Sequence, residues 1–107
     1  MSLDVYLEDE NGDRLYQRNI THNLTKMAGT AGLYECLWRP EEIGIITAYQ
    51  LIEPISKGIA FLATYRIVCE QDNPPNGWGN WECLYDFCCD YLKACTDHPL
   101  STIRVSR

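Results

Sequence analysis

The spacing of apolar residues changes twice along the chain, and this pattern constrains the fold more than any other feature. Apolar and polar residues alternate over residues 3–7, which is the period of a strand with one buried face. Asn11-Gly12 then favours a hairpin turn, so residues 15–20 should return as a second strand. Residues 100–105 alternate again and predict a third strand, which we expect to pair with the hairpin because an isolated hairpin is marginally stable.

The segment after the hairpin predicts a short, imperfect helix. Thr21 or Asn23 can cap its first turn, and apolar residues then recur at three- and four-residue steps as far as Tyr34. Gly29 and Gly32 lower the helix propensity of this stretch. We therefore expect a helix that is irregular or closely packed.

Two longer amphipathic helices follow. The first is expected over residues 47–63, where Pro54 should kink it or divide it and Gly58 would permit close contact with another helix. Residues 65–80 are expected to form the longest irregular connection, and residues 80–96 the last helix.

The order of strand, strand, helices and strand predicts an α+β fold. We expect a small antiparallel sheet, made of the N-terminal hairpin and the C-terminal strand, packed on about three helices. The length of 107 residues suits a single domain, residues 1–107, with one modest hydrophobic core.

Charge and hydropathy exclude some classes of partner. The net charge of −6 argues against direct binding to nucleic-acid backbones, which requires a cationic surface. Many of the acids lie within residues 4–13, as expected for a solvated hairpin rim or, alternatively, for a surface that mimics DNA. No basic and apolar leader opens the chain, and no run approaches the ~20 apolar residues that span a bilayer. We expect a cytoplasmic location and no membrane partner.

The chain has no recognisable catalytic or metal signature. A reducing cytosol would keep its cysteines as thiols, and they are not arranged in the close pairs typical of zinc sites. Buried core thiols are the simpler interpretation, and a metal or redox site is the alternative; the cysteines are Cys36, Cys69, Cys83, Cys88, Cys89 and Cys95. There is no nucleophile turn and no glycine-rich phosphate loop, so we predict no catalytic residue, no metal and no cofactor.

A loop over residues 73–81 displays two tryptophans. Trp81 falls on the apolar stripe of the last predicted helix, which favours a place in the core. Trp78 lies between two glycines, with Asn76 shortly before it, and either fills the core or offers a stacking surface.

The junction of strand and helix around His22 is a second candidate site. Backbone N–H groups exposed at such a junction, here near Asn19, Thr21 and Asn23, can hold an anion. Structural capping, ligand contact and general-base catalysis all stay open at this point. Catalysis would need a carboxylate partner such as Glu41 or Glu82, brought close by folding.

Trp38-Arg39 forms a third candidate. Arg39 can pair with a carboxylate of this chain, namely Glu41, Glu42 or Glu82, or it can grip a phosphate or stack on a ring of a ligand. Trp38 would supply such a ligand with an aromatic plane.

These segments resemble small proteins encoded by bacteriophages and prophages. The resemblance covers residues 3–107, and it is carried by residues 19–24, residues 37–45, Asn76-Gly77-Trp78-Gly79 and Val105-Ser106-Arg107. It implies an accessory phage protein in the cytoplasm of a bacterial host, and it implies no particular activity.

In that setting we expect non-catalytic binding. One hypothesis is a counter-defence protein that sequesters a nucleotide-derived signal; its ligand-binding residues would be Asn19, Thr21, His22, Asn23, Trp38, Arg39, Asn76 and Trp78. The alternatives are an inhibitor that binds a host protein directly, or a structural component of the virion, which would show extended self-association. A homo-oligomer is a further expectation that the sequence leaves open. A small enzyme has the least support in the sequence.

Overall fold

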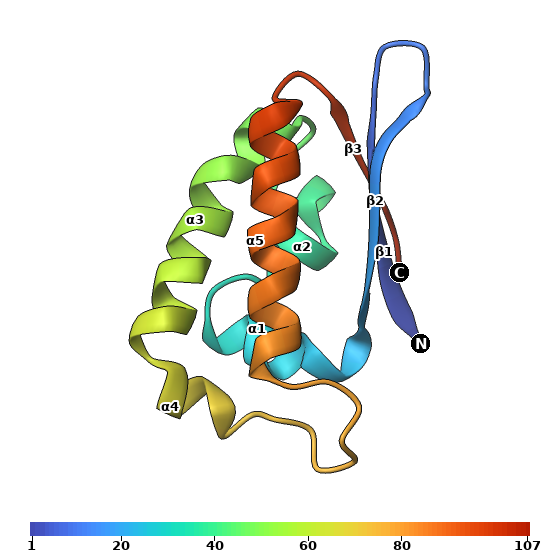
Figure 1. Ribbon diagram of the computed structural model, residues 1–107. Helices are drawn as coiled ribbons and strands as arrows, with labels where there is room; N and C mark the ends of the chain where they lie inside the picture. Colours follow the sequence, from blue (N-terminus) through green and yellow to red (C-terminus); the bar gives the residue numbers. More distant parts are fainter.

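The computed structural model describes residues 1–107 as an α+β fold in which one three-stranded antiparallel sheet lies against a layer of helices (Figure 1). β1 (Ser2–Glu8) and β2 (Arg14–Thr21) form the hairpin, and β3 (Thr102–Ser106) pairs with the other edge of β1. The sheet order is therefore β2-β1-β3. The predicted fold class and the pairing of the last strand with the hairpin are confirmed.

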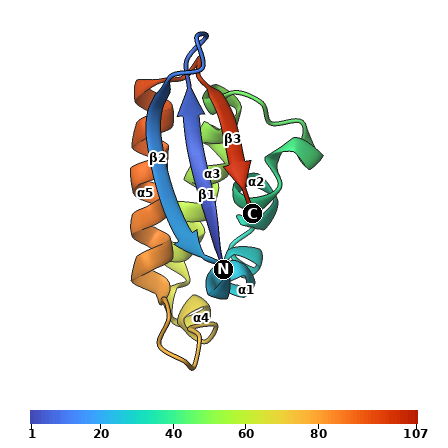
Figure 2. The same ribbon diagram turned by 90° about the vertical axis from the view of Figure 1, so that its right-hand side faces the viewer.

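The two faces of the sheet differ in chemistry, as the alternating sequence requires. Leu3, Val5 and Leu7 are fully buried against the helices. The opposite face carries polar groups: Asn19 lies across from Asp4 and donates to its carboxylate at 2.8 Å. No helix covers this face, which points toward the viewer in Figure 2. One face is therefore core and the other is solvated.

The segment after β2 is broken into three short pieces. These are a 3-10 turn, η1 (His22–Leu24), followed by α1 (Thr25–Thr30) and α2 (Tyr34–Trp38). Thr21 is the cap, because its hydroxyl accepts from the Asn23 N–H at 3.2 Å. Gly32 has a φ of 72°, which ends the first helix, so the expected irregularity is confirmed.

A second 3-10 turn, η2 (Pro40–Ile43), leads to α3 (Ala48–Thr64), which is a single helix. The expectation that Pro54 divides this helix is wrong. A proline removes one backbone donor, and Leu51 and Ile55 on either side of it are fully buried, so packing holds the helix together across Pro54. Gly58 is buried against Leu33 of the preceding segment, which confirms the expected close contact.

The connection predicted over residues 65–80 is also partly helical. α4 (Arg66–Glu70) interrupts it because Cys69 is fully buried in the core and ties this turn to the domain. The irregular part is the loop over residues 71–80. α5 (Trp81–Asp97) then begins after Asn80, whose side chain accepts from the Cys83 N–H at 3.0 Å.

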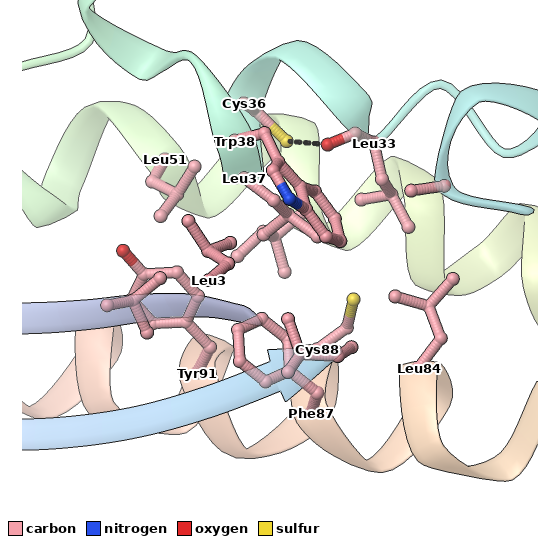
Figure 3. Close-up of a cluster of buried hydrophobic side chains, with 14 of the residues drawn as sticks. Leu3, Leu33, Cys36, Leu37, Trp38, Leu51, Leu84, Phe87, Cys88 and Tyr91 are labelled. Atoms are coloured by element: carbon pink, nitrogen blue, oxygen red, sulfur yellow. Dashed lines mark hydrogen bonds between the residues drawn. The ribbon is translucent and has the colours of Figure 1, made fainter. Parts of the chain in front are cut away.

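The core lies between the sheet, α3 and α5. Figure 3 shows the indole of Trp38 among side chains from α5 and β1, including Phe87, Tyr91 and Leu3. Trp81 is 7% exposed and donates its indole N–H to the Leu62 carbonyl at 3.0 Å, so it belongs to the core as expected. No helix of the structure combines the length and the apolar character that a membrane span requires.

Candidate binding surface around Trp78

Trp78 is the one exposed indole of the molecule. Its exposed fraction is 72%, whereas Trp38 and Trp81 are 1% and 7% exposed. A tryptophan is the largest apolar side chain and is seldom left this open to water without a partner. The loop that carries it is therefore the strongest candidate for a binding surface.

Side-chain hydrogen bonds hold the Trp78 loop in place on both sides. The Trp78 N–H donates to Asn76 Oδ1 at 2.9 Å, and the Trp78 carbonyl accepts from Asn23 Nδ2 at 3.3 Å. Further along, Asn73 Oδ1 accepts from the Trp81 N–H at 2.9 Å. The loop backbone is thus pinned to the start of α5 and to the junction after β2.

Gly79 brings this loop close to that junction. Its φ is 102°, in the region that favours glycine, and a Cβ there would lie 3.0 Å from the Thr21 methyl group and 3.2 Å from Leu24. A side chain at this position would push the loop away from Thr21 and Leu24. Gly79 is therefore required for the close packing of the Trp78 loop against the end of β2.

Beside the indole lies a groove of about 470 Å³ between the end of β2 and the start of α5. Trp78 forms part of its wall, together with Asn19 and Thr21 of β2. The remaining lining residues are Arg18, Ile20, Gly79, Asn80, Glu82, Cys83, Asp86 and Phe87. A second hollow of about 350 Å³ lies on the other side of the loop and includes Asn23 and Asn76.

Carboxylates dominate the charge of the groove. Arg18 is engaged by Asp90 at 2.9 Å, and Tyr16 donates to the same carboxylate at 2.8 Å. Hydrogen bonds from Arg18 and Tyr16 lower the pKa of Asp90 below its ordinary value. Glu82 pairs with Arg66 at 3.2 Å, whereas Asp86 makes no ion pair. The groove thus keeps an unneutralised carboxylate and has no free cation.

The structure separates the predicted site residues into groups. Asn19, Thr21 and Trp78 share the groove, and Asn23 and Asn76 share the second hollow. The Asn23 to Trp78 hydrogen bond joins these two hollows across the loop. None of the five main surface hollows is lined by the other three predicted residues, His22, Trp38 and Arg39.

Trp38 is a core residue, so the expectation that it offers a stacking plane is wrong. Its ring stacks on Tyr34 with centroids 5.8 Å apart, and its indole N–H donates to His22 Nδ1 at 2.9 Å. His22 therefore provides the hydrogen-bond acceptor that the buried indole N–H of Trp38 requires. This hydrogen bond occupies one of the two ring nitrogens of His22 and gives the residue a structural role.

Arg39 does not present a free guanidinium. It donates to the Tyr34 hydroxyl at 3.1 Å and to Glu42 at 2.9 Å, so the intramolecular pair is the alternative that the structure supports. The two carboxylates considered as partners for His22 are also engaged: Glu41 pairs with Arg107, and Glu82 pairs with Arg66.

A row of acids on α5 was missed in reading the sequence. Glu82, Asp86 and Asp90 are spaced by four residues, and each lines a hollow beside β2. The four-residue spacing is visible in the sequence, but it does not indicate whether these acids face open solvent or another element of the fold. Only the fold shows that this row faces the edge of the sheet.

The structure contains no group of three or more histidine, cysteine, aspartate or glutamate side chains placed to hold a metal ion. Comparison of the chain with models of known protein families, with curated proteins and with solved structures finds no match. The candidate surface consequently stands on its geometry and charge alone.

Proposed function

We propose that this protein acts by non-catalytic binding of another protein, and that it does so through the Trp78 surface, defined as Trp78 and the groove beside it. One observation carries the proposal: an indole that is 72% exposed on a loop whose backbone is held by hydrogen bonds on both sides.

A fixed, exposed tryptophan suits the centre of a protein interface. Tryptophan is enriched among the residues that supply most of the binding energy in such interfaces. A loop already ordered in the free protein loses little conformational entropy on binding, which raises affinity for a given contact area. The hydrogen bonds from Asn23 and to Asn76 supply that order here.

The charges favour a protein partner over a nucleotide. A nucleotide site at Trp78 would need a cation or free N–H groups for the phosphates, yet Arg39 lies elsewhere and Arg18 is engaged by Asp90. Asp86 and Glu82 in the groove would repel a phosphate. Sequestration of a nucleotide signal is therefore the second hypothesis, without an observation that favours it.

The resemblance to phage proteins supplies the biological setting of the proposal. In that setting the partner is a protein of the bacterial host, and the chain acts as an accessory, counter-defence protein in the host cytoplasm. Stoichiometric inhibition of a host protein needs no catalytic group on this chain.

The experiment compares three immobilised proteins: the wild type, Trp78→Ala and Tyr49→Ala. Tyr49 is a matched control because it is 69% exposed and lies in the first turn of α3, far from Trp78. Its backbone N–H donates to the carbonyl of Pro99, just after the end of α5 that is opposite to the Trp78 loop. Bacterial proteins retained by the wild type and Tyr49→Ala, and lost by Trp78→Ala, are identified by mass spectrometry and purified. Calorimetry should then give a complex of fixed stoichiometry.

Two results would contradict the proposal. Retention of the same proteins by Trp78→Ala would show that the indole is not part of the interface. Recovery of a nucleotide from heat-denatured wild-type protein, and not from Trp78→Ala, would favour the second hypothesis.

A further inference from the structure

We infer that the segment bound beside Trp78 is an extended, basic stretch of the partner, which adds as a new strand to the outer edge of β2. This inference rests on the proposed function and names the partner chemistry for the same surface. The observations that carry it are a free strand edge, a row of acids beside that edge and a groove between the edge and two of these acids.

β2 has a free outer edge. In the sheet order β2-β1-β3, β2 pairs with β1 on one side only. On its other side, the backbone groups of residues 14–20 form no backbone hydrogen bond. Such an edge has unpaired N–H and C=O groups, to which an extended peptide can add. Figure 2 shows this edge at the border of the sheet, with α5 running behind it.

The groove follows the edge of the strand. Four consecutive residues of β2, Arg18 to Thr21, line the hollow that contains Trp78. Since successive side chains of a strand point to opposite faces, a hollow lined by four in a row lies along the edge. Further along β2, a separate hollow is lined by Leu15 and Tyr16 of the strand and by Asp90 of α5. Another hollow is lined by Leu15 and residues of the hairpin turn.

The acids of α5 line these hollows on the side opposite β2. Asp86 and Glu82 lie in the hollow beside Trp78, and Asp90 lies in the next one. Residues four apart on a helix are separated by about 6 Å. Alternate residues of a strand are separated by about 7 Å. An added strand would therefore place every second side chain over one acid of the row.

This match determines the chemistry of the occupant. A peptide with Lys or Arg at alternate positions would meet Asp86, which has no ion pair, and the exposed carboxylate of Glu82. The net charge of −6 favours its approach. A second copy of this chain fits less well, because antiparallel pairing of two β2 edges would bring two acidic rows to the same side of the joined sheet.

The test uses synthetic nine-residue peptides. The probe alternates Lys and Thr, and a second peptide has Glu in place of Lys. Two further versions of the Lys-Thr probe carry N-methyl groups on the backbone nitrogens of every Lys or of every Thr. N–H groups of a strand point alternately to its two edges, so each methylated version blocks one edge only.

We expect the Lys-Thr probe to bind and the Glu-Thr peptide not to bind. One methylated version should lose at least about tenfold in affinity while the other binds like the probe, because only the first loses its hydrogen bonds to the β2 edge. Amide NMR shifts should fall on β2 and α5 and leave β3 unchanged. Asp86→Asn should weaken the probe about two- to fivefold, and Glu35→Gln, an exposed acid on α2, should not.

Equal affinity of the two methylated versions would overturn the inference, because charge attraction alone would then explain binding. Absence of binding by the Lys-Thr probe would overturn it as well, as would a homodimer whose NMR contacts lie along β2. The proposed function is judged separately. If the wild type still binds a host protein that Trp78→Ala does not bind, while the peptides do not bind the wild type, only the added strand is wrong.

Discussion

Replacing Gly58 with alanine is expected to destabilise the protein strongly, although alanine has the higher helix propensity. An added Cβ at Gly58 would lie 2.9 Å from Leu33 Cδ1 and closer still to Cγ and Cδ2 of the same side chain. Carbon atoms pack at about 3.5–4.0 Å, so the Leu33 side chain would have to move by roughly 1 Å or more. Leu33 is fully buried, so it can only move against other core side chains.

The expected loss follows from this overlap. Overpacking a core by a methyl group costs about 1–3 kcal/mol, and overlap with three atoms of the buried Leu33 side chain places Gly58→Ala near about 3 kcal/mol. For a domain of this size, about 4 °C of melting temperature corresponds to each kcal/mol, so we expect a fall of about 12 °C. The measurement is thermal and urea unfolding followed by circular dichroism.

Gly29→Ala is the matched control. Gly29 lies in α1, and an added Cβ there has no atom within 4 Å. Alanine should therefore raise the free energy of unfolding by up to about 1 kcal/mol. Combining Gly58→Ala with Leu33→Ala should cost less than the two changes added, because the second removes the atoms in conflict. A melting temperature of Gly58→Ala within about 2 °C of the wild type, or strict additivity, would refute the reasoning.

The other predictions concern the two loop tryptophans and the thiols. Trp81→Ala should lower the free energy of unfolding by about 3–5 kcal/mol, because it empties a buried site, whereas Trp78→Ala should change it by less than about 0.5 kcal/mol; similar denaturation midpoints would contradict both. Burial raises the pKa of Cys36 and Cys95 to about 12 from an ordinary value of 9.0. The unfolded chain loses these protons at lower pH than the folded protein does, so the thiols' contribution to the free energy of unfolding is fully present below pH 9. It falls between pH 9 and 12, by up to about 1.4 kcal/mol per pH unit for each thiol. A free energy of unfolding, measured with urea, that does not change over this pH range would be evidence against burial. Cys83 is exposed, so Cys83→Ala should remove the fastest-labelled thiol in a reaction with a maleimide.

Much of the fold was predictable because it depends on neighbours in the chain. Alternation over residues 3–7 and the Asn11-Gly12 turn determine a hairpin locally, and the helical stripe after Asn80 determines α5. The break at Gly32 was also foreseeable, since glycine readily takes the positive φ found there. The division considered at Pro54 is not found, because the cost of one lost hydrogen bond is local, whereas the packing that outweighs it comes from the whole core.

The candidate site shows the opposite balance. In the sequence, the loop with Trp78 was the clearest binding candidate, and Trp38 was a further candidate for an exposed aromatic plane. Only the fold places Trp38 against Tyr34 and His22, and leaves Trp78 in water. The sequence by itself determined the three strands, the two long helices and where a tryptophan loop joins the second of these helices, but not the short helix α4. The tertiary structure alone decided which indole is exposed and that the acids of α5 face β2, because burial and juxtaposition arise from contacts between residues far apart in the chain.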